Sequence, residues 1–269
     1  MIGYIHSVET MGTVDNGGIR FVLFLQGCRL RCTFCHNPDT WLASGKSVTV
    51  AEIIDQLKNY KIFFELSGGG LTVSGGEPLL QSSFVKELFV EAGKLGIHRA
   101  LDTAGYCKRG NLQEVLPYTD LVIFSLKVVD PEKHRRLTER ENVDIIKNLR
   151  LTAESQVQLV VCYVLIPGIN DSPEDVRDLA DLVKSLNRKV PVDVLAYSKL
   201  GADKWVEMGL SDPLAGVAPA TQEQVERFQA RLGEMGVDLY HAQHKRKNTF
   251  SSSLENSGTG ENSLSSLSQ

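Results

Sequence analysis

The stretch GCRLRCTFCHN, from Gly27 to Asn37, decides how this chain of 269 residues is interpreted. Its three cysteines follow the spacing C-x3-C-x2-C. Iron–sulfur cubanes are normally held by four cysteine thiolates, so this loop is one ligand short of a complete cage. A cluster held by three thiolates leaves one iron open to an outside ligand, much as a catalytic zinc keeps a free position. The loop therefore predicts a [4Fe-4S] cluster, bound by Cys28, Cys32 and Cys35, that can act on what it binds.

Other interpretations of the cysteine loop fit less well. A zinc knuckle needs a fourth cysteine or a histidine at finger spacing, and His36 directly follows Cys35, too close to complete one tetrahedral site. A disulfide framework needs an even cysteine count in a secreted chain, whereas this chain has five cysteines. Structural thiols explain one or two cysteines, but not this density. Cys107 and Cys162 stand alone, and we interpret them as buried apolar thiols.

The composition is that of an ordinary globular protein. Hydrophobic residues make up 42% of the chain, enough for a sizeable core, and the length suits one large α/β domain. A net charge of −4 argues against a nucleic-acid-binding face, which would be basic. No apolar run approaches the ~20 residues of a membrane helix, and the N-terminus lacks the features of a signal peptide. Free thiols then indicate a reducing cytoplasm.

Residues 245–269 differ in character from the rest of the chain. They are rich in Ser, Asn and Gly, and they contain too few large apolar side chains to offset the entropy lost on ordering. We therefore predict a single folded domain over residues 1–244, followed by a disordered tail over residues 245–269.

Apolar runs alternate with helical patterns along the domain. A continuous run over residues 19–26 ends at the cysteine loop and predicts a buried parallel strand. Further strands are predicted at residues 71–73, 99–101, 121–126, 157–166, 192–195 and 237–240. Capping residues at Thr49, Ser172 and Thr221 predict three helix starts, the first helix running to residue 57. One more helical face is formed by Phe84, Val85, Leu88, Phe89 and Ala92.

The candidate polar residues follow the ends of these strands. Strands that alternate with helices indicate right-handed βαβ units and a parallel sheet. In a barrel of such units, chemistry gathers at the carboxyl ends of the strands. The cysteine loop, Gly75-Gly76-Glu77, Asp102-Thr103 and Lys127 all lie at such ends. We therefore expect them to meet at one site.

The motifs and their order resemble those of the radical S-adenosylmethionine enzymes. The segment 28–41, CRLRCTFCHNPDTW, is similar to their cluster loop, and its second half, HNPDTW, is similar to the pyruvate formate-lyase activating enzymes in particular. Shorter matches are GTVD (12–15), GIRF (18–21), SGGEP (74–78) and LDTAG (101–105). The resemblance spans about residues 2–240, and it implies an α/β fold of the partial, six-stranded (β/α) TIM-like barrel type.

The resemblance also implies which residues bind the cofactors. The three thiolates hold one [4Fe-4S] cluster, and S-adenosylmethionine chelates the open iron through its amino and carboxylate groups. The backbone around Phe34 contacts the adenine, Gly75-Gly76-Glu77 binds the amino group, and Asp102-Thr103 helps to hold a monovalent cation beside the carboxylate. The implied cofactor-binding residues are Phe34, Cys35, His36, Gly75, Gly76, Glu77, Asp102, Thr103, Ser125, Leu126, Lys127 and Asp203.

Two of these motifs also allow a simpler interpretation. Gly75-Gly76 can be a strand-ending turn, because glycine adopts positive φ without strain. Asp102-Thr103 can cap a turn, because both side chains bond readily to nearby backbone. The sequence alone leaves these alternatives open.

Several positions depart from the family pattern. Ser125-Leu126-Lys127 stands where the family has Asp-Leu-Lys, so a carboxylate is missing from the implied cation site. Cys162 occupies the place of an arginine near the substrate, and Asp203 that of a histidine that touches the cofactor. Glu139 stands where relatives have glycine. The changes from basic to neutral or acidic residues alter the electrostatics of the substrate side.

The resemblance as a whole predicts a glycyl radical enzyme activase. S-adenosylmethionine would be cleaved reductively at the cluster, and the 5′-deoxyadenosyl radical would abstract a hydrogen from a glycine Cα of a partner protein. The expected partner is pyruvate formate-lyase, the expected electron donor is flavodoxin or ferredoxin, and the chain is expected to be a monomer. Alternatives are a radical enzyme acting on another glycyl radical enzyme or on a small molecule, and a non-catalytic cluster or zinc protein.

Overall fold

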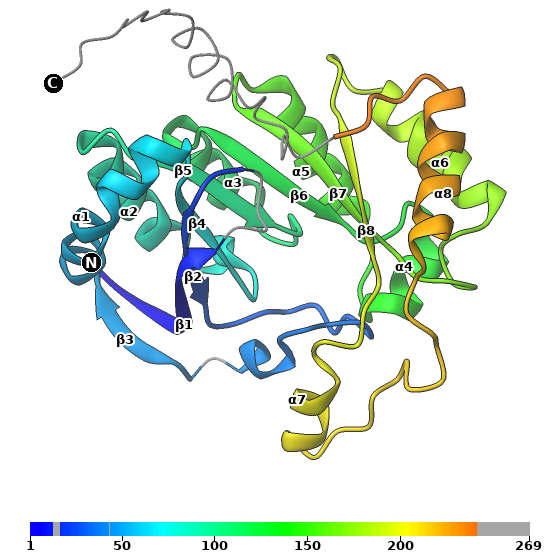
Figure 1. Ribbon diagram of the computed structural model, residues 1–269, viewed down its shortest axis with the longest axis horizontal. Coiled ribbons are helices and arrows are strands. Elements are labelled where there is room, and N and C mark those ends of the chain that lie inside the picture. The colour runs from blue at the N-terminus through cyan, green and yellow to red at the C-terminus, as the bar shows by residue number, and fades with distance from the viewer. Residues whose placement is uncertain (13–16, 43, 241–269) are drawn as a thin grey trace, which may run out of the picture.

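The computed structural model describes residues 1–12, 17–42 and 44–240, which are organised around one eight-stranded sheet (Figure 1). The strand order is β3-β1-β2-β4-β5-β6-β7-β8. Six neighbouring strands run parallel to one another. They are β2 (Arg20–Leu25), β4 (Gly70–Gly75), β5 (His98–Thr103), β6 (Leu121–Leu126), β7 (Gln158–Leu165) and β8 (Val192–Ala196).

The parallel strands follow one another in chain order without reversal. A right-handed connection at each step then puts the helices on one side of the sheet, as in a barrel and unlike a doubly wound sheet. Figure 1 shows the helices around the outer side. They are α1 (Val50–Ser67), α2 (Ser82–Lys94), α3 (Arg109–Val115), α4 (Pro131–Thr138), α5 (Val143–Glu154), α6 (Pro173–Lys184) and α8 (Gln222–Glu234). The predicted six-stranded βα arrangement is confirmed, within a larger sheet.

Side chains of each strand alternate between the helix side and the inner side. On β6, Val122 and Phe124 belong to the main core beneath the helices, whereas Leu121 and Ile123 belong to a small inner cluster. A strand has a period of two, so neighbouring residues face opposite sides. The next inward position on β6 after Ile123 is Ser125, which already lies at the carboxyl end of the strand.

The predicted helix starts are confirmed. Thr49 and Glu52 form a reciprocal capping box at the start of α1, and Thr221 does the same with Gln224 at α8. Ser172 caps α6. Helix α1 runs to Ser67, well past the predicted end at residue 57. The predicted apolar face of α2 is fully buried.

Two antiparallel strands at one edge of the sheet were not predicted. They are β1 (Ile2–Gly12), which pairs with β2, and β3 (Lys46–Thr49), which pairs with β1. The strand predicted at residues 237–240 is wrong. That segment makes one parallel bridge, between Val192 and Leu239, and its two backbone hydrogen bonds to the sheet are both at Val192.

Some predictions fall on residues that the structure does not describe. They concern residues 13–15 of the GTVD motif and the tail over residues 245–269, with the domain boundary at 244. Within the described residues, no helix is both long and apolar enough to cross a membrane.

Candidate active site

The carboxyl ends of the parallel strands and the cysteine loop enclose a cavity of about 240 Å³. The loop contributes all three of its cysteines to the lining. The ends of three strands contribute the other polar groups, and a fourth strand contributes Val164. The lining comprises Cys28, Leu30, Cys32, Phe34, Cys35, His36, Asn37, Thr40, Trp41, Ser74, Gly75, Gly76, Asp102, Ala104, Lys127 and Val164.

The three thiols of the loop are close to one another and largely shielded from water. Burial raises the pKa of Cys28 to about 11 and that of Cys32 to about 12, and burial also raises the pKa of Cys35. The three groups also act on one another's charge. A thiol with a raised pKa loses its proton when a metal takes the sulfur as a ligand. A metal centre bound here would therefore displace the protons of these thiols.

The two kinds of metal centre considered for the cysteine loop differ in how their ligands are arranged. In the described residues, no three Cys, His, Asp or Glu side chains converge as they would on a single metal ion. A structural zinc site requires such convergence of its ligands. In a four-iron cluster each thiolate binds a different iron, so the sulfur atoms stay further apart. Three cysteines around one cavity are compatible with the predicted cluster.

Helix α4 supports the cysteine loop from one side through its carboxyl end. The backbone N–H of Arg31 donates to Thr138 O at 2.9 Å, and that of Thr33 donates to Leu137 O at 2.9 Å. Carbonyls in the last turn of a helix have no partner within the helix, so the loop satisfies them. The helix ends at Thr138 and is capped by Glu139, which has φ 59°. It is the one non-glycine residue with positive φ among the described residues.

Helix α7 (Ala202–Glu207) holds the loop from the other side. Trp205 Nε1 donates to Cys35 O at 3.0 Å, and its ring lies edge-on to Trp41 with centroids 5.1 Å apart. Lys204 Nζ donates to Asn37 Oδ1 at 2.7 Å and pairs with Asp39 at 3.2 Å. Figure 1 shows α7 beside the cysteine-loop region. The HNPDTW segment therefore serves as the docking surface for α7.

Lys204 and Trp205 are site residues that were not predicted from the sequence. Both follow directly on Asp203, which was assigned to the cofactor. Asp203 itself is exposed and does not line the cavity. The available signal was a tryptophan and a lysine in a short polar helix, but their partners lie about 165 residues earlier. Only the fold brings the two segments together.

A carboxylate with two hydroxyl partners lies opposite the cysteine loop. Asp102 accepts hydrogen bonds from Ser74 Oγ at 2.7 Å and from Ser125 Oγ at 3.2 Å. Burial opposes the positive charge of Lys127, but the neighbouring Cys32 and Asp102 outweigh it and raise the pKa of the ammonium. The site thus combines a carboxylate, an ammonium and three sulfur donors, which can hold a zwitterionic ligand beside a metal cluster.

Glu77 and Thr103 bond to each other instead of lining the cavity. Thr103 Oγ1 donates to Glu77 Oε1 at 2.6 Å, and the backbone N–H groups of Leu79 and Ala104 also donate to this carboxylate. Glu77 is 1% exposed, and its burial raises its pKa. The pair ties the turn after β4 to the end of β5, so its observed role is to position the strand ends.

Gly75 and Gly76 allow the end of β4 to pack against the chain beside it. Gly75 has φ 111°, and a Cβ there would lie 2.3 Å from Leu25 N. A Cβ at Gly76 would lie 2.2 Å from Gly27 O. Any side chain would therefore push the cysteine loop away from the strand. The turn interpretation holds for these glycines, and both also line the cavity.

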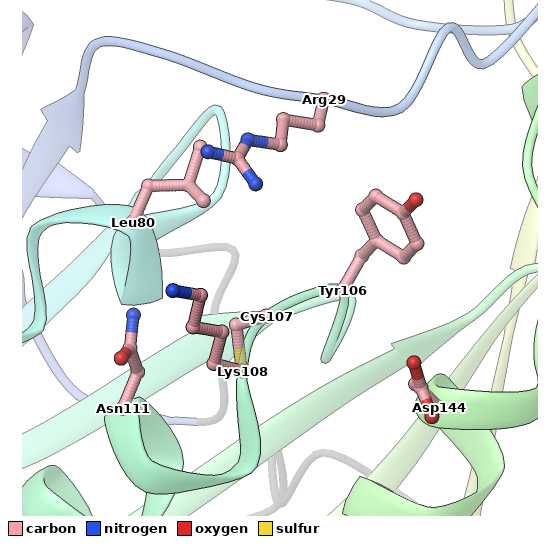
Figure 2. Close-up of a pocket in the computed structure, with 7 residues that line it drawn as sticks. All are labelled: Arg29, Leu80, Tyr106, Cys107, Lys108, Asn111 and Asp144. Atoms are coloured by element: carbon pink, nitrogen blue, oxygen red, sulfur yellow. The ribbon is translucent and has the colours of Figure 1, made fainter.

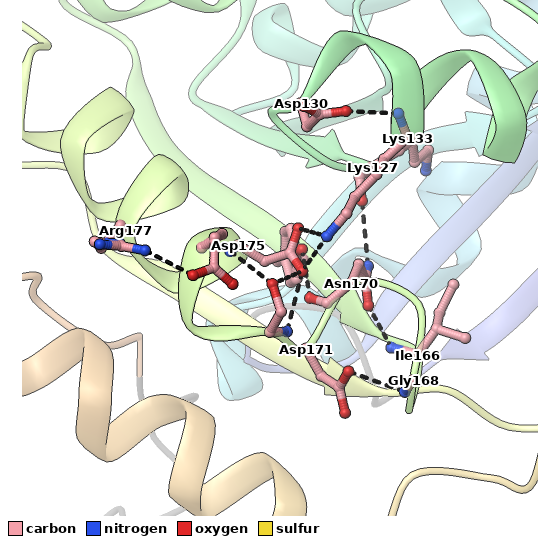
Figure 3. Close-up of polar contacts among 12 residues, drawn as sticks. Lys127, Asp130, Lys133, Ile166, Gly168, Asn170, Asp171, Asp175 and Arg177 are labelled. Carbon is pink, nitrogen blue, oxygen red and sulfur yellow. Dashed lines mark hydrogen bonds and ion pairs between the residues drawn. The ribbon is translucent and has the colours of Figure 1, made fainter.

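A buried asparagine fixes the far wall of the site (Figure 3). Asn170 Nδ2 donates to Val164 O at 2.9 Å and to Lys127 O at 3.4 Å, while its Oδ1 accepts from Ile166 N at 2.7 Å. The ends of β6 and β7 are thereby joined. Beside it, Lys133 of α4 pairs with the buried Asp175 at the start of α6 at 2.7 Å.

The remaining predicted residues are placed as follows. Phe34 lines the cavity with its ring 5.6 Å from Lys127 Nζ. His36 is exposed and its ring bonds to Ser198 O at 3.2 Å. Leu126 faces the helix side and belongs to the main core. Cys162 is buried in the inner cluster, as predicted, and is paired in register with Ser125.

Comparison with known proteins identifies the same family that the motifs resemble. Residues 22–183 match the radical SAM superfamily. The chain is 42% identical over 232 residues to a pyruvate formate-lyase-activating enzyme of Listeria monocytogenes, covering 84% of this chain and 94% of that protein. It is 39% identical over 248 residues to the Staphylococcus aureus enzyme of the same name, covering 88% and 99%.

Solved structures agree with the fold. A domain of a pyruvate-formate lyase-activating enzyme from Bacteroides vulgatus superposes with a TM-score of 0.54 at 26% identity, over 64% of this chain and 98% of that one. A radical SAM methyltransferase from Sphaerobacter thermophilus superposes with a TM-score of 0.62 at 19% identity, over 82% and 65%. At that low identity, the second similarity concerns the fold alone.

Proposed function

The chain belongs to the radical SAM superfamily and, within it, to the pyruvate formate-lyase-activating enzymes, and from this premise we propose that it installs a glycyl radical in a partner enzyme. The partner is pyruvate formate-lyase, as for the relatives that carry that name. A low-potential flavodoxin or ferredoxin supplies the electron, and the reaction takes place in the cytoplasm.

One observation carries the proposal. Cys28, Cys32 and Cys35 line the same cavity as Asp102 and Lys127. Three thiolates leave one iron of a [4Fe-4S] cluster open. The amino and carboxylate groups of S-adenosylmethionine need both an open iron and charged or polar protein groups within reach. This cavity offers both kinds of group.

The cofactors carry the difficult chemistry, and the chain positions them. When bound, the cluster and S-adenosylmethionine supply one electron and a sulfonium C–S bond, which together yield methionine and a 5′-deoxyadenosyl radical that takes a glycine Cα hydrogen. Lys127 and the Asp102 group hold the polar end of the ligand beside the cysteine loop. Helices α4 and α7 keep that loop in place from both sides. No side chain needs to act as a general acid or base.

The proposal includes a monovalent cation, which is bound more weakly here than in relatives. Asp102 supplies one carboxylate, but the neighbouring position is Ser125, which donates its hydroxyl to Asp102. Hard cations prefer carboxylate and carbonyl oxygens. With one carboxylate instead of two, the cation is held less tightly here.

The proposal is tested by anaerobic activation. The protein is reconstituted with iron and sulfide, and then mixed with S-adenosylmethionine, dithionite and pyruvate formate-lyase. We expect 5′-deoxyadenosine by chromatography and a glycyl doublet by electron paramagnetic resonance. Cys107→Ser serves as the matched control for cysteine-loop variants, because Cys107 lies outside the cavity.

The outcomes separate the alternatives. A glycyl doublet supports both the reaction and the partner. Formation of 5′-deoxyadenosine without a doublet points to a different glycyl radical enzyme or to a small-molecule substrate. An intact cluster that gives neither product contradicts the proposal and favours a non-catalytic iron–sulfur protein.

A further inference from the structure

A second cavity, of about 410 Å³, lies on the outer side of the cysteine loop. Figure 2 shows Arg29 reaching into it from the loop above, opposite Lys108 and Tyr106 from the chain below. The site described above does not use any of these groups. The lining is Arg29, Leu80, Tyr106, Cys107, Lys108, Asn111 and Asp144. Cys107 is therefore only half-buried, contrary to the prediction of a buried thiol.

The two cavities share a wall. Cys28 and Leu30 line the active-site cavity, whereas Arg29 between them lines the second one. The chain after β5 behaves in the same way, because Ala104 lines the first cavity and Tyr106 the second. Consecutive residues of two segments thus line opposite cavities, so the outer cavity lies next to the cysteine loop.

The outer cavity is positively charged. Arg29 and Lys108 are exposed, and neither side chain has a hydrogen-bond or ion-pair partner among the described residues. Arg109, also exposed, follows directly. The one acidic residue in the lining, Asp144, pairs with Lys147 at 3.3 Å. This cluster of free cations occurs in a chain with a net charge of −4.

We infer that Arg29, Lys108 and Arg109 form the docking surface for an acidic, low-potential electron-transfer protein, whose redox group approaches the cluster through the outer cavity. The inference rests on the proposed function. Complementary charge steers such partners and raises their association rate by roughly 10–10³-fold. The inner side of the loop is taken by S-adenosylmethionine and the partner glycine, so the electron enters from the opposite side.

The electron balance is simple. One electron passes from the reduced donor to the cluster, which goes from the 2+ to the 1+ state, and the donor leaves one electron more oxidised. That electron then reduces the sulfonium. No proton or leaving group crosses the docking surface, so proximity and charge are its only requirements.

The test compares two reductants on the reconstituted protein. We propose the single variants Arg29→Glu and Lys108→Glu, with Arg231→Glu on α8 as the control because it makes the same charge change at an exposed position on another helix. The probe is a reduced flavodoxin. We measure its binding by fluorescence anisotropy, the rate of cluster reduction by stopped flow, and 5′-deoxyadenosine formation. Dithionite, a small reductant, replaces the flavodoxin in a parallel series.

We expect each of the two variants to weaken flavodoxin binding and slow flavodoxin-driven reduction at low salt by about tenfold, with the difference shrinking at high salt. Dithionite-driven rates and the Arg231→Glu control should stay within about twofold of the unchanged protein. Unchanged flavodoxin binding in both variants overturns the docking surface, and so does an equal loss with both reductants. Failure of the unchanged protein to cleave S-adenosylmethionine with dithionite contradicts the proposed function instead, while the binding and reduction measurements still decide the docking surface.

Discussion

The two ends of the parallel sheet use their polar residues in opposite ways. At the amino ends, Arg20 is 1% exposed and donates to Thr72 Oγ1 and Leu71 O. Arg99 and Asp120 pair there at 2.6 Å. At the carboxyl ends, the three cysteines, Asp102 and Lys127 surround a cavity. The polar groups named at the amino ends thus pair with one another, whereas those at the carboxyl ends line the cavity beside the cysteine loop.

The difference shows where the fold is stabilised and where it acts. Polar groups that satisfy one another stabilise the fold, and Arg20 does so while almost fully buried. Polar groups that face a cavity keep capacity for a ligand, and barrels of βα units place chemistry at the carboxyl ends. Substitutions at the two ends should therefore separate stability from catalysis.

The largest effect is expected at the carboxyl end. Replacing Cys32 by alanine removes one cluster ligand, and we expect iron binding to collapse and 5′-deoxyadenosine formation to fall by more than about 10³-fold. The thermal midpoint of the iron-free protein should change little. Iron content and product are measured side by side, with Cys107→Ser as the control. A Cys32→Ala protein that retains full iron and turnover would contradict the assignment of the loop.

A substitution at the amino end should lower stability and leave the activity per folded molecule unchanged. Arg20→Met leaves Thr72 and a backbone carbonyl without a buried donor, so we expect a loss of about 2–5 kcal/mol in the free energy of unfolding. Urea titration measures it. Product formed per folded, iron-loaded molecule should stay near that of the unchanged protein. A large loss of specific activity without loss of stability would break the division between the two ends.

A smaller gain in stability is expected beneath the cysteine loop. Glu139 holds a left-handed conformation that costs an L-residue roughly 1 kcal/mol relative to glycine. Glu139→Gly should therefore stabilise the protein by about that amount in urea titration. Glu141→Gly, at an exposed neighbour without left-handed backbone, is the control and should be neutral or destabilising. Destabilisation by Glu139→Gly would mean that the Glu139 side chain stabilises the fold by more than the strain of its left-handed backbone destabilises it.

The amino-end ion pair should appear in the acid limb of the stability curve. Burial raises the pKa of Asp120, but hydrogen bonds from Arg99 outweigh it and hold the pKa below its ordinary value. The stabilisation is therefore complete above the ordinary value and is lost as pH falls through the lowered one. Asp120→Asn should reduce the dependence of the urea midpoint on pH in that acid range. If the urea midpoint of Asp120→Asn depended on pH as steeply as that of the unchanged protein, the pair would be screened by solvent and would not contribute to the acid limb.

The most subtle effect concerns the cation. Ser125→Asp places a second carboxylate beside Asp102, where the observed hydroxyl contact is 3.2 Å. Like charges at that distance repel unless a cation joins them. We expect potassium to stimulate the variant by a few-fold while the unchanged protein responds little. Ser74→Ala, which removes the other hydroxyl partner without adding charge, is the control. If Ser125→Asp and the unchanged protein respond identically to potassium, the missing carboxylate does not weaken a cation site.

Much of the sheet could be predicted because apolar runs record burial on both faces of a parallel strand. Strand β6 has the same bounds, 121–126, in sequence and structure. Strand β1 was not predicted because it lies near the edge of the sheet. Its first residues alternate between exposed and buried, with Ile2 and Tyr4 exposed, so they form no continuous apolar run. The segment 237–240 is apolar except for Asp238, and it makes one bridge because it meets β8 at that strand's first residue.

The sequence predicted which strand ends form the site, but not which of their residues line the cavity and which support it. Strand ends identified Asp102 and Lys127, but neighbours on a strand face opposite sides. Thr103 and Leu126 therefore point away from the cavity, toward Glu77 and the core. The period of two could have shown this. The contact of Trp205 with the cysteine loop could not be foreseen, because it depends on where the chain returns after β8.

The central claim is that the cavity at the carboxyl ends generates a radical that removes a glycine hydrogen. The most direct measurement uses pyruvate formate-lyase deuterated at glycine Cα, with S-adenosylmethionine and dithionite added to the reconstituted protein. We predict one deuterium in the 5′-deoxyadenosine, by mass spectrometry, together with a glycyl radical signal. Unlabelled 5′-deoxyadenosine and no glycyl radical, from a fully loaded protein, would contradict it.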